Sequence, residues 1–185
     1  MTQQLWWYTA RASGLVAWVL VTASVIWGLL LSVRRISRPR PAWMLDLHRF
    51  LGAAALGLVA LHLGALSFDS FVGFGWRDLF VPYASQWRPG AVAWGIVALY
   101  LVVAVEVTSL MMRSLGRRLW HAIHLLSLVV FVSITVHALV AGADAQEPAL
   151  RAFAIASSTA VAGLCAVRVA ARRAPRQSAP AAVTR

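Results

Sequence analysis

The chain has 185 residues, of which 61% are hydrophobic and only 12% are charged, a composition that excludes an ordinary soluble domain of this size. Its formal net charge of +11 comes from seventeen arginines and no lysine. Most of these arginines flank apolar segments, which is typical of membrane topology signals and argues against a nucleic-acid partner.

Five apolar segments are each long enough to cross about 30 Å of hydrocarbon, which takes roughly twenty helical residues. In chain order they cover residues 14–33, 47–68, 91–112, 119–140 and 150–170. The first is not a cleavable signal peptide, because its arginine pair follows the apolar run and no small-residue cleavage site is present. The sequence therefore predicts an all-α protein: a polytopic bundle of five transmembrane helices in the lipid bilayer.

The arginines are divided unequally between the two ends of these helices. Only Arg11, Arg77, Arg88 and Arg151 fall on one side, and the other thirteen fall on the opposite side. By the positive-inside rule, the N-terminus is expected outside and the C-terminus in the cytoplasm of a multi-pass cell-membrane protein. Residues 1–172 form one membrane domain in this interpretation, and residues 173–185 form a disordered basic tail.

The loop between the second and third segments, residues 69–90, is the only long one and is predicted on the outer side. Its aromatic side chains include Trp76, Tyr83 and Trp87, which suit the membrane interface. We expect a lid over the bundle, with simple interfacial anchoring as the alternative.

The histidines lie only in the second and fourth segments. His48 and His62 are in the former; His121, His124 and His137 are in the latter. The two segments run in the same direction, so His48 and His124 share the cytoplasmic level and His62 and His137 share the outer level. One imidazole from each of two helices at each level is the arrangement expected for two stacked bis-histidine haems.

Helix geometry favours this hypothesis for the second segment. The 14-residue step gives a rise of about 21 Å and leaves the two side chains only about 40° apart. The face between them carries the small residues Gly52, Ala55 and Val59. In the fourth segment the 13-residue step leaves His124 and His137 about 140° apart on an ideal helix, so local overwinding or different haem orientations are required.

Histidines also occur within membrane helices for reasons unrelated to haem. A single intramembrane histidine often forms a hydrogen bond between helices. A bare zinc or copper site would need ligands gathered at one point, whereas these lie at two depths. His121, at the cytoplasmic edge, is interpreted as interfacial, with exchange for His124 as the alternative.

The stretches LHRFLG…LHL and WHAIHLL…VHAL, with their 14- and 13-residue steps, resemble the ferric reductase-like transmembrane domain. That superfamily includes ferric reductases, NADPH oxidases and the haem-binding subunit of a periplasmic methionine sulfoxide reductase system. The resemblance covers roughly residues 47–141. It implies haem b as cofactor, with His48 and His124 as axial ligands of an inner haem and His62 and His137 as ligands of an outer one.

Two features depart from that family. Its members commonly have six helices with histidines on the third and fifth, and the flavin and nicotinamide domain of the oxidases is not found in this sequence. The expected function is therefore electron transfer by a membrane cytochrome b subunit, from a flavoprotein or quinol to an outer acceptor such as a periplasmic reductase. The alternatives are a haem-bearing anchor and a haem-handling subunit, both without net electron transfer.

Several further charged residues have open roles in the sequence. Glu106 lies inside the third segment and is interpreted either as a proton relay or as the partner of Arg34, Arg35 or Arg113. Asp46 and Arg49 are spaced to pair on a helix. Some arginines are candidate partners of haem propionates, with an ordinary topological role as the alternative; they are Arg49, Arg113, Arg117 and Arg118 inside and Arg77 and Arg88 outside.

Overall fold

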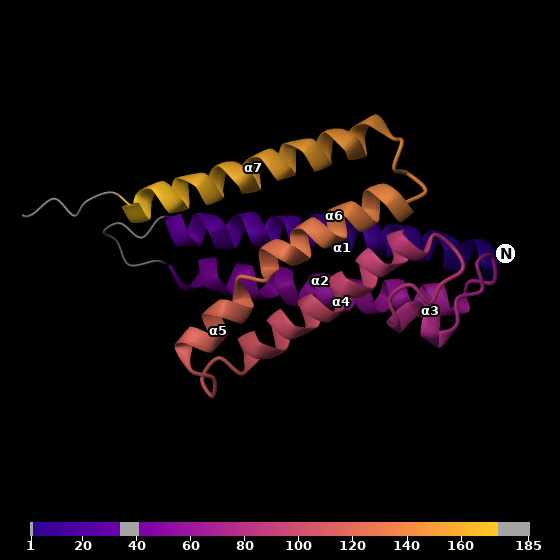
Figure 1. Cartoon of the computed structure of the whole chain (residues 1–185), viewed down its shortest axis with the longest axis horizontal. Helices are drawn as coiled ribbons and strands as arrows, with labels where there is room; N and C mark the ends of the chain where they lie inside the picture. Colours follow the sequence, from indigo (N-terminus) through magenta and orange to yellow (C-terminus); the bar gives the residue numbers. More distant parts are fainter. Residues whose placement is uncertain (1, 34–40, 174–185) are drawn as a thin grey trace, which may run out of the picture.

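The computed structural model describes residues 2–33 and 41–173, and all its regular elements in these ranges are helices (Figure 1). They are α1 (Thr2–Val33), α2 (Ala42–Phe68), α3 (Trp76–Phe80), α4 (Pro89–Leu110), α5 (Arg117–His124), α6 (Ser127–Ala141) and α7 (Pro148–Arg173). Five spans are long and apolar enough to cross a membrane, with α5 and α6 together forming the fourth. The predicted all-α bundle of five candidate spans is confirmed. Of the tail predicted at residues 173–185, Arg173 is instead the last residue of α7, and residues 174–185 lie outside the described residues.

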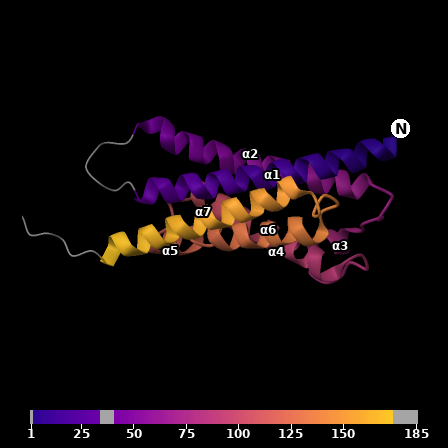
Figure 2. The ribbon, with the colours of Figure 1, turned by 90° about the horizontal axis from the view of Figure 1, so that it is seen from above.

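Successive spans run in opposite directions, so the bundle has two chemically different ends (Figures 1 and 2). The start of α1, the α2–α4 connection with α3, and the α6–α7 connection lie together at one end, called here the N-terminal end. The end of α1, the α4–α5 connection and the end of α7 lie at the other. We call this the arginine-rich end, because exposed arginines such as Arg49, Arg113 and Arg117 lie there.

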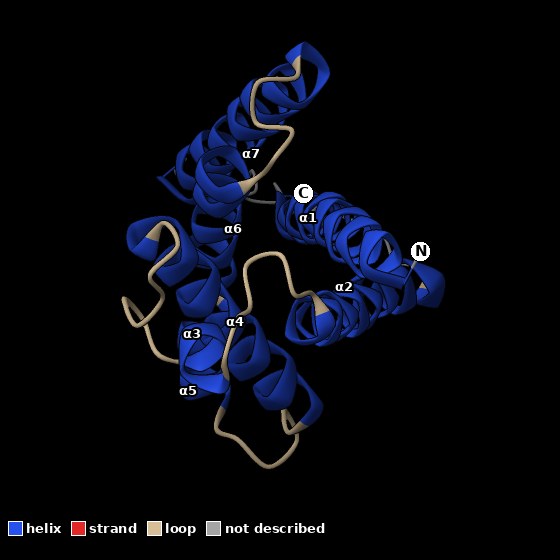
Figure 3. Ribbon diagram, turned by 90° about the vertical axis from the view of Figure 1, so that its right-hand side faces the viewer, coloured by secondary structure: helices blue, strands red, loops and turns tan. Residues whose placement is uncertain are grey.

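The spans are arranged as two packed pairs. α1 packs mainly against α2, α4 packs against α6, and α7 lies along α1. Figure 3 shows the two pairs end-on, with the start of the α2–α4 connection folded over the space between them. A buried apolar cluster joins both pairs midway along the bundle; it comprises Val21, Val25, Leu29, Ala55, Val102, Val130, Phe131 and Val161. The two histidine levels are therefore separated by an apolar layer.

Trp18 fixes α1 against two other helices. Its side chain is almost completely buried, and its ring lies edge-on to Phe153 of α7 at 5.0 Å between centroids. Its indole N–H donates a hydrogen bond to Thr135 Oγ1 of α6 at 3.1 Å. A buried tryptophan requires such a partner, because its indole N–H is costly to leave unsatisfied in an apolar core.

The first span begins earlier than the sequence predicts. Helix α1 starts at Thr2, not near residue 14, and so includes Arg11 within its length. The arginine is accommodated because its guanidinium forms an ion pair with Asp144 of the α6–α7 connection and lies 4.7 Å from the Trp7 ring. Pairing the charge offsets the cost of placing it near the apolar part of the bundle.

The fourth span is broken directly after His124. Leu125 and Leu126 form a turn between α5 and α6, and Figure 1 shows the bend between these helices. Leu126 and Leu128 donate backbone hydrogen bonds three residues back, to Ile123 and Leu125 at 2.9 and 3.2 Å. This is the tighter 3₁₀ pattern, which adds about 20° of rotation per residue relative to an α-helix. Overwinding of this sense reduces the angle of about 140° that would separate His124 and His137 on an ideal helix.

Candidate functional site

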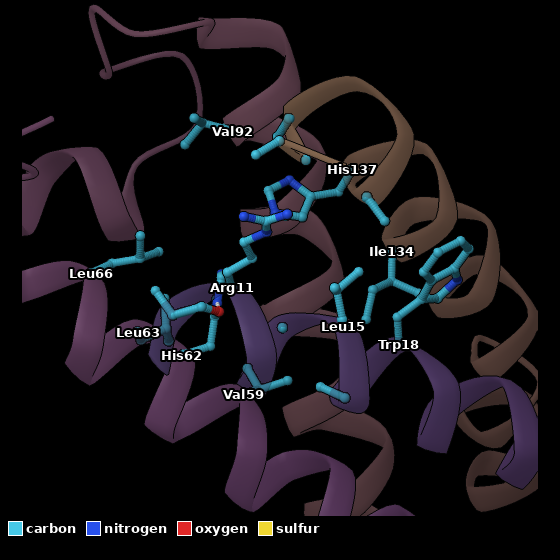
Figure 4. Close-up of a pocket in the computed structure, with 18 of the residues that line it drawn as sticks. Arg11, Leu15, Trp18, Val59, His62, Leu63, Leu66, Val92, Ile134 and His137 are labelled. Carbon is cyan, nitrogen blue, oxygen red and sulfur yellow. Dashed lines mark hydrogen bonds between the residues drawn. The ribbon is translucent and has the colours of Figure 1, made fainter. Parts of the chain in front are cut away.

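His62 and His137 line one large cavity at the N-terminal end of the bundle. The cavity has a volume of about 1050 Å³ and lies between the two helix pairs, with Val59, Ile96 and Val130 on its apolar walls. Figure 4 shows the two histidines reaching it from α2 and α6, with Arg11 directed into the same space from α1. This volume is at the upper end of the range found for sites that bind organic cofactors.

Each of these two imidazoles donates a hydrogen bond to a main-chain carbonyl of the neighbouring helix. His62 Nδ1 lies 2.6 Å from the Ala10 oxygen of α1, and His137 Nδ1 lies 2.8 Å from the Ala91 oxygen of α4. A carbonyl oxygen can only accept, so Nδ1 carries the proton in both rings. In the neutral imidazole Nε2 then keeps its lone pair, which is the form required of a metal ligand.

A glycine one helical turn after each of these carbonyls gives the imidazole access to it. A Cβ added at Gly14 would lie 2.9 Å from His62 Nδ1, and one added at Gly95 would lie 2.8 Å from His137 Nδ1. Residues four apart lie above one another on a helix face, so a side chain at the fourth position would occupy the ring's place. The glycines therefore fix where the two rings can lie.

His48 and His124 form the second pair, toward the arginine-rich end. Their ring centroids are 5.9 Å apart and the ring planes are inclined by 75°. Two metal–imidazole bonds of about 2 Å each place the centroids of opposed axial ligands about 6 Å apart. The separation of this pair is compatible with two axial ligands on one iron.

Both imidazoles of this second pair contact serines of the neighbouring helices, and His48 is also hydrogen-bonded to the main chain of Ser24. His48 Nδ1 lies 3.2 Å from Ser24 Oγ, and His124 Nδ1 lies 3.4 Å from Ser109 Oγ. The Ser109 hydroxyl donates its own proton to the Val105 carbonyl at 2.7 Å, so it accepts from the His124 ring. Gly28, four residues after Ser24, repeats the glycine contact, since an added Cβ would lie 3.0 Å from the His48 ring.

Two further aromatic side chains, Trp120 and His121, lie on the His124 side of this pair. Trp120 stacks on His124 at 5.0 Å between centroids, with the planes inclined by 24°. Its indole nitrogen is buried and has no hydrogen-bond partner among the described residues. His121 reaches this cluster through its contact with Trp120, at 6.1 Å between ring centroids. The structure therefore pairs His48 with His124 and leaves His121 outside the pair.

The mouth of the cavity is polar and carries both signs of charge. Arg11, Arg88, Asp69 and Asp144 line it, together with aromatic residues of the 69–90 loop such as Trp87. Arg77, a candidate propionate partner in the sequence, does not line the cavity. Arg11, which was expected only to be a topology signal, does line it. Both ends of the loop thus line the cavity, which is the position that a lid would have.

The middle of the 69–90 loop, residues 80–86, does not line the cavity, and neither does Trp76. Trp76 and Tyr83 are 76% and 73% exposed, as the anchoring alternative expects. Arg88 holds the end of the loop in place: it donates to the Val140 carbonyl of α6 at 2.8 Å and lies 5.2 Å from the Trp87 ring. Its positive φ of 43° is a conformation that costs an arginine energy.

Glu106 lies between α4 and α2, against Gly52. Its carboxylate forms no ion pair with any described residue, so a pair with Arg113 is not found; Arg34 and Arg35 lie outside the described residues. The face of α2 that carries small residues, predicted to accommodate a porphyrin, therefore has two roles. Gly52 leaves room for the Glu106 side chain, and Val59 lines the cavity. Asp46 and Arg49 pair at 3.7 Å as predicted, on the exposed surface where such a pair adds little stability.

The donor set fits a haem better than a bare metal ion. Within residues 2–33 and 41–173, no three His, Cys, Asp or Glu side chains converge as a metal site. The histidines come instead in pairs, and a porphyrin needs only two axial ligands from the protein because it supplies the other four nitrogens. Glycine contacts at His48, His62 and His137, and the Nδ1 hydrogen bonds of all four imidazoles, restrict the orientation of the rings, as axial ligation requires.

Several residues of the site were not predicted from the sequence. Ala10 and Ala91 act through their main-chain carbonyls, which leave no signature in a sequence. The glycines did leave one: Gly14 and Gly28 are separated by the same 14 residues as His48 and His62, and they follow Ala10 and Ser24 by four residues each. An equal spacing of glycines on one span and histidines on the next is the signal that could have paired these two helices.

Comparison with known proteins gives no match to a family model, to a curated protein or to a solved structure.

Proposed function

We propose that the protein is a transmembrane electron carrier that binds two b-type haems, one between His48 and His124 and one between His62 and His137. The proposal rests mainly on the hydrogen bonding of the four imidazoles. Each directs Nδ1 to an acceptor on the adjacent helix and keeps Nε2 for iron. The resemblance of the histidine spacing to the ferric reductase-like transmembrane domain supports the same function.

The haem would supply the one-electron chemistry, and the chain's own residues would hold and isolate it. The histidines would ligate iron, the glycines Gly14, Gly28 and Gly95 would fix the ring positions, and the apolar walls would exclude water. At the mouth of the cavity a propionate would bind Arg88, whereas Arg11 would have to exchange its ion pair with Asp144 for one with the propionate, since arginine binds carboxylates bidentately. The donor would be a flavoprotein or quinol, and the acceptor a reductase or oxidant on the other side of a cell membrane.

The first prediction is a haem content of two per chain, with a defined pairing pattern. His48→Leu and His124→Leu should each remove one and the same haem, and His62→Leu and His137→Leu should each remove the other. Leucine is more favourable than histidine in hydrocarbon, so the helices should still insert. A pyridine haemochrome assay and the reduced-minus-oxidised spectrum of each purified variant measure the outcome.

His121→Leu is the matched control and should keep both haems. If His48 and His137 removed the same haem, or if all four variants kept full haem content, the assignment would be wrong. Electron transfer itself is tested by reduction with dithionite followed by mixing with an acceptor such as ferric citrate or oxygen. Bound haem that does not reoxidise would contradict the carrier function and favour a haem-bearing anchor.

A further inference from the structure

Glu106 places a carboxylate inside the bundle, close to the His48–His124 pair. A Cβ added at Gly52 would meet this carboxylate, so the side chain reaches from α4 to the face of α2 that carries Gly52. Gly52 follows His48 by four residues, and side chains at that spacing share one face, with Cβ atoms about 5–6 Å apart. On α4, Glu106 precedes Ser109 by three residues, and Ser109 contacts the His124 ring. The carboxylate therefore lies about one helical turn from His48 and from the serine that contacts His124.

The other histidine pair is much farther from this carboxylate. His137 lies against Gly95 of α4. Gly95 precedes Glu106 by eleven residues, which is about 16 Å along a helix. The buried apolar cluster lies between the two levels. Because the interaction between charges weakens with distance, we expect Glu106 to act mainly on the His48–His124 level.

The Glu106 carboxylate has no cation to balance it. It forms neither an ion pair nor a hydrogen bond with any residue of 2–33 and 41–173. The titratable and charged groups on α4, on the elements packed against it and near His124 are Tyr100 on α4, Asp46, His48, Arg49 and His62 on α2, Arg77 and Asp78 on α3, Arg113 in the α4–α5 connection, Arg117, Arg118, His121 and His124 on α5, His137 on α6 and Arg168 on α7. A carboxylate within hydrocarbon is costly unless a positive charge lies nearby or the group binds a proton.

The proposed haem would supply a positive charge in only one of its redox states. A ferric porphyrin with two neutral imidazole ligands carries one net positive charge, and the ferrous form carries none, because the porphyrin contributes two negative charges. The charge of a metal centre acts directly on the protonation of the groups around it. The Glu106 carboxylate is therefore balanced when the site is oxidised and unbalanced when the site is reduced.

Resting on the proposed function, we propose that Glu106 is the proton acceptor coupled to reduction of the His48–His124 haem. Glu106 binds one proton when this site gains one electron, and it releases the proton when the electron leaves. One electron and one proton thus enter and leave together, the net charge stays constant, and only the O–H bond of the carboxyl forms and breaks. Glu106 is about one turn from the end of α4 at Leu110, so the proton is exchanged at the arginine-rich end.

The coupling is tested by measuring how the midpoint potential depends on pH. The His62→Leu variant, expected to retain only the His48–His124 haem, is titrated in detergent and followed by absorbance. Because a higher pH opposes the proton uptake, its potential should fall as the pH rises, by up to about 59 mV per pH unit for one proton per electron. With Glu106→Gln added, the potential should not vary with pH. At high pH it should lie above that of the parent, because a negative charge has been removed.

Matched variants separate Glu106 from the other titratable groups of this end. Asp46→Asn and His121→Leu, each in the His62→Leu background, should keep the pH dependence, as should Glu106→Asp, which retains a carboxyl group. In the His48→Leu background, Glu106→Gln should leave the potential of the remaining haem unchanged. Infrared redox difference spectra provide a second measurement. The carbonyl stretch of a protonated carboxyl should appear on reduction of the wild type, shift in Glu106→Asp and be absent in Glu106→Gln.

Two results would overturn the inference while leaving the haem sites intact. They are a potential of the His62→Leu variant that does not vary with pH, and a pH dependence that persists in Glu106→Gln. If Glu106→Gln lost haem, the infrared spectra of the wild type and Glu106→Asp would decide, since a carboxyl band that is absent or does not shift refutes the role of Glu106. A wild-type protein without haem would overturn the proposed function as well.

Discussion

At the scale of single residues, the site is built from a unit of three: a histidine, an acceptor on the next helix, and a glycine one turn after that acceptor. His62, Ala10 and Gly14 form one such unit, and His137 with Ala91 and Gly95 forms another. The glycine is required because the main-chain carbonyl is reached from the side, across the position where a Cβ would lie. The unit sets both the tautomer and the orientation of the ring.

Alanine at these glycines should remove haem from one level only. Gly14→Ala and Gly95→Ala place a methyl group 2.9 and 2.7 Å from the nearest atom of the His62 and His137 rings. Relieving such an overlap costs about 1–3 kcal/mol in a packed core. We expect lower occupancy or affinity at the His62–His137 level, while Gly28→Ala should affect the His48–His124 level. Haem titration of each variant measures the change.

Matched controls lie on α2. At Gly57 and Gly64 of this helix, an added Cβ meets no other atom within 4 Å. Gly57→Ala and Gly64→Ala should bind haem like the wild type, and the added methyl should favour the helix by up to about 1 kcal/mol. Equal losses in the controls and in Gly14→Ala would mean that general destabilisation, not the position of the ring, governs haem binding.

At the scale of elements, the break between α5 and α6 determines whether the fourth span can contribute to both levels. A continuous α-helix would place His124 and His137 on different faces, because thirteen residues leave about 140° between them. The turn at Leu125 and Leu126, with its 3₁₀ hydrogen bonds, supplies rotation in the direction needed. The second span needs no such break, since its fourteen residues return to nearly the same face.

One inserted alanine after Leu126 discriminates between these geometries. On a continuous helix the insertion would lengthen the step to fourteen and improve the alignment of His124 with His137. In the observed structure it should rotate the residues before it by about 100° and separate His124 from His48. We expect loss of the His48–His124 haem and retention of the other, as measured by spectra and haem content.

An alanine inserted after Gln146 controls for the insertion itself. That position is in the α6–α7 connection, beyond the last histidine, and both haems should remain. If the insertion after Leu126 kept both haems as well, the break would not position His124. Loss of both haems would point to a failure of the whole span and would equally contradict the level-specific role.

Most of the element structure was predictable from the sequence, and the differences have physical causes. Hydropathy identified the five spans because an apolar run of about twenty residues has few structural alternatives to a transmembrane helix. Hydropathy missed the first third of α1, because a charged residue such as Arg11 normally marks the end of an apolar span. Its ion pair with Asp144, far along the chain, cannot be deduced from the sequence. The break after His124 contains neither proline nor glycine, so it has no local signal.

The candidate site was predictable only in part. The four histidines and their pairing by level followed from residue spacing, and the structure brings His48 and His124 together and places His62 and His137 on one cavity. Their acceptors could not be predicted, because they depend on which helix packs beside which and on main-chain atoms that every residue has. For the same reason the sequence could not predict that Arg11 lines the cavity and that Arg77 does not.

At the scale of the whole molecule, the bundle has one end where charges balance and one where arginine predominates. The balanced end holds the cavity, the folded loop and the ion pair between α1 and the α6–α7 connection. Arginine-rich ends are retained in the cytoplasm during insertion, so the cavity is expected to face outward. In this orientation the proposed His62–His137 haem would lie toward an acceptor outside, and the proposed His48–His124 haem toward a cytoplasmic donor.

The orientation gives the last prediction. A phosphatase reporter inserted after Ala145, in the α6–α7 connection, should be active outside the cell, and a fluorescent reporter fused after Arg185 should fold in the cytoplasm. The two positions lie on either side of α7 in the chain, so the pair should give opposite results whichever way the bundle is inserted. Exchanging the two reporters is the control, since each should then be silent.

If the phosphatase were active only at Arg185, the cavity with His62 and His137 would face the cytoplasm. Electrons from a cytoplasmic donor would then have to enter at the His62–His137 pair, and the positive-inside argument would be wrong for this chain even though both histidine pairs kept their geometry.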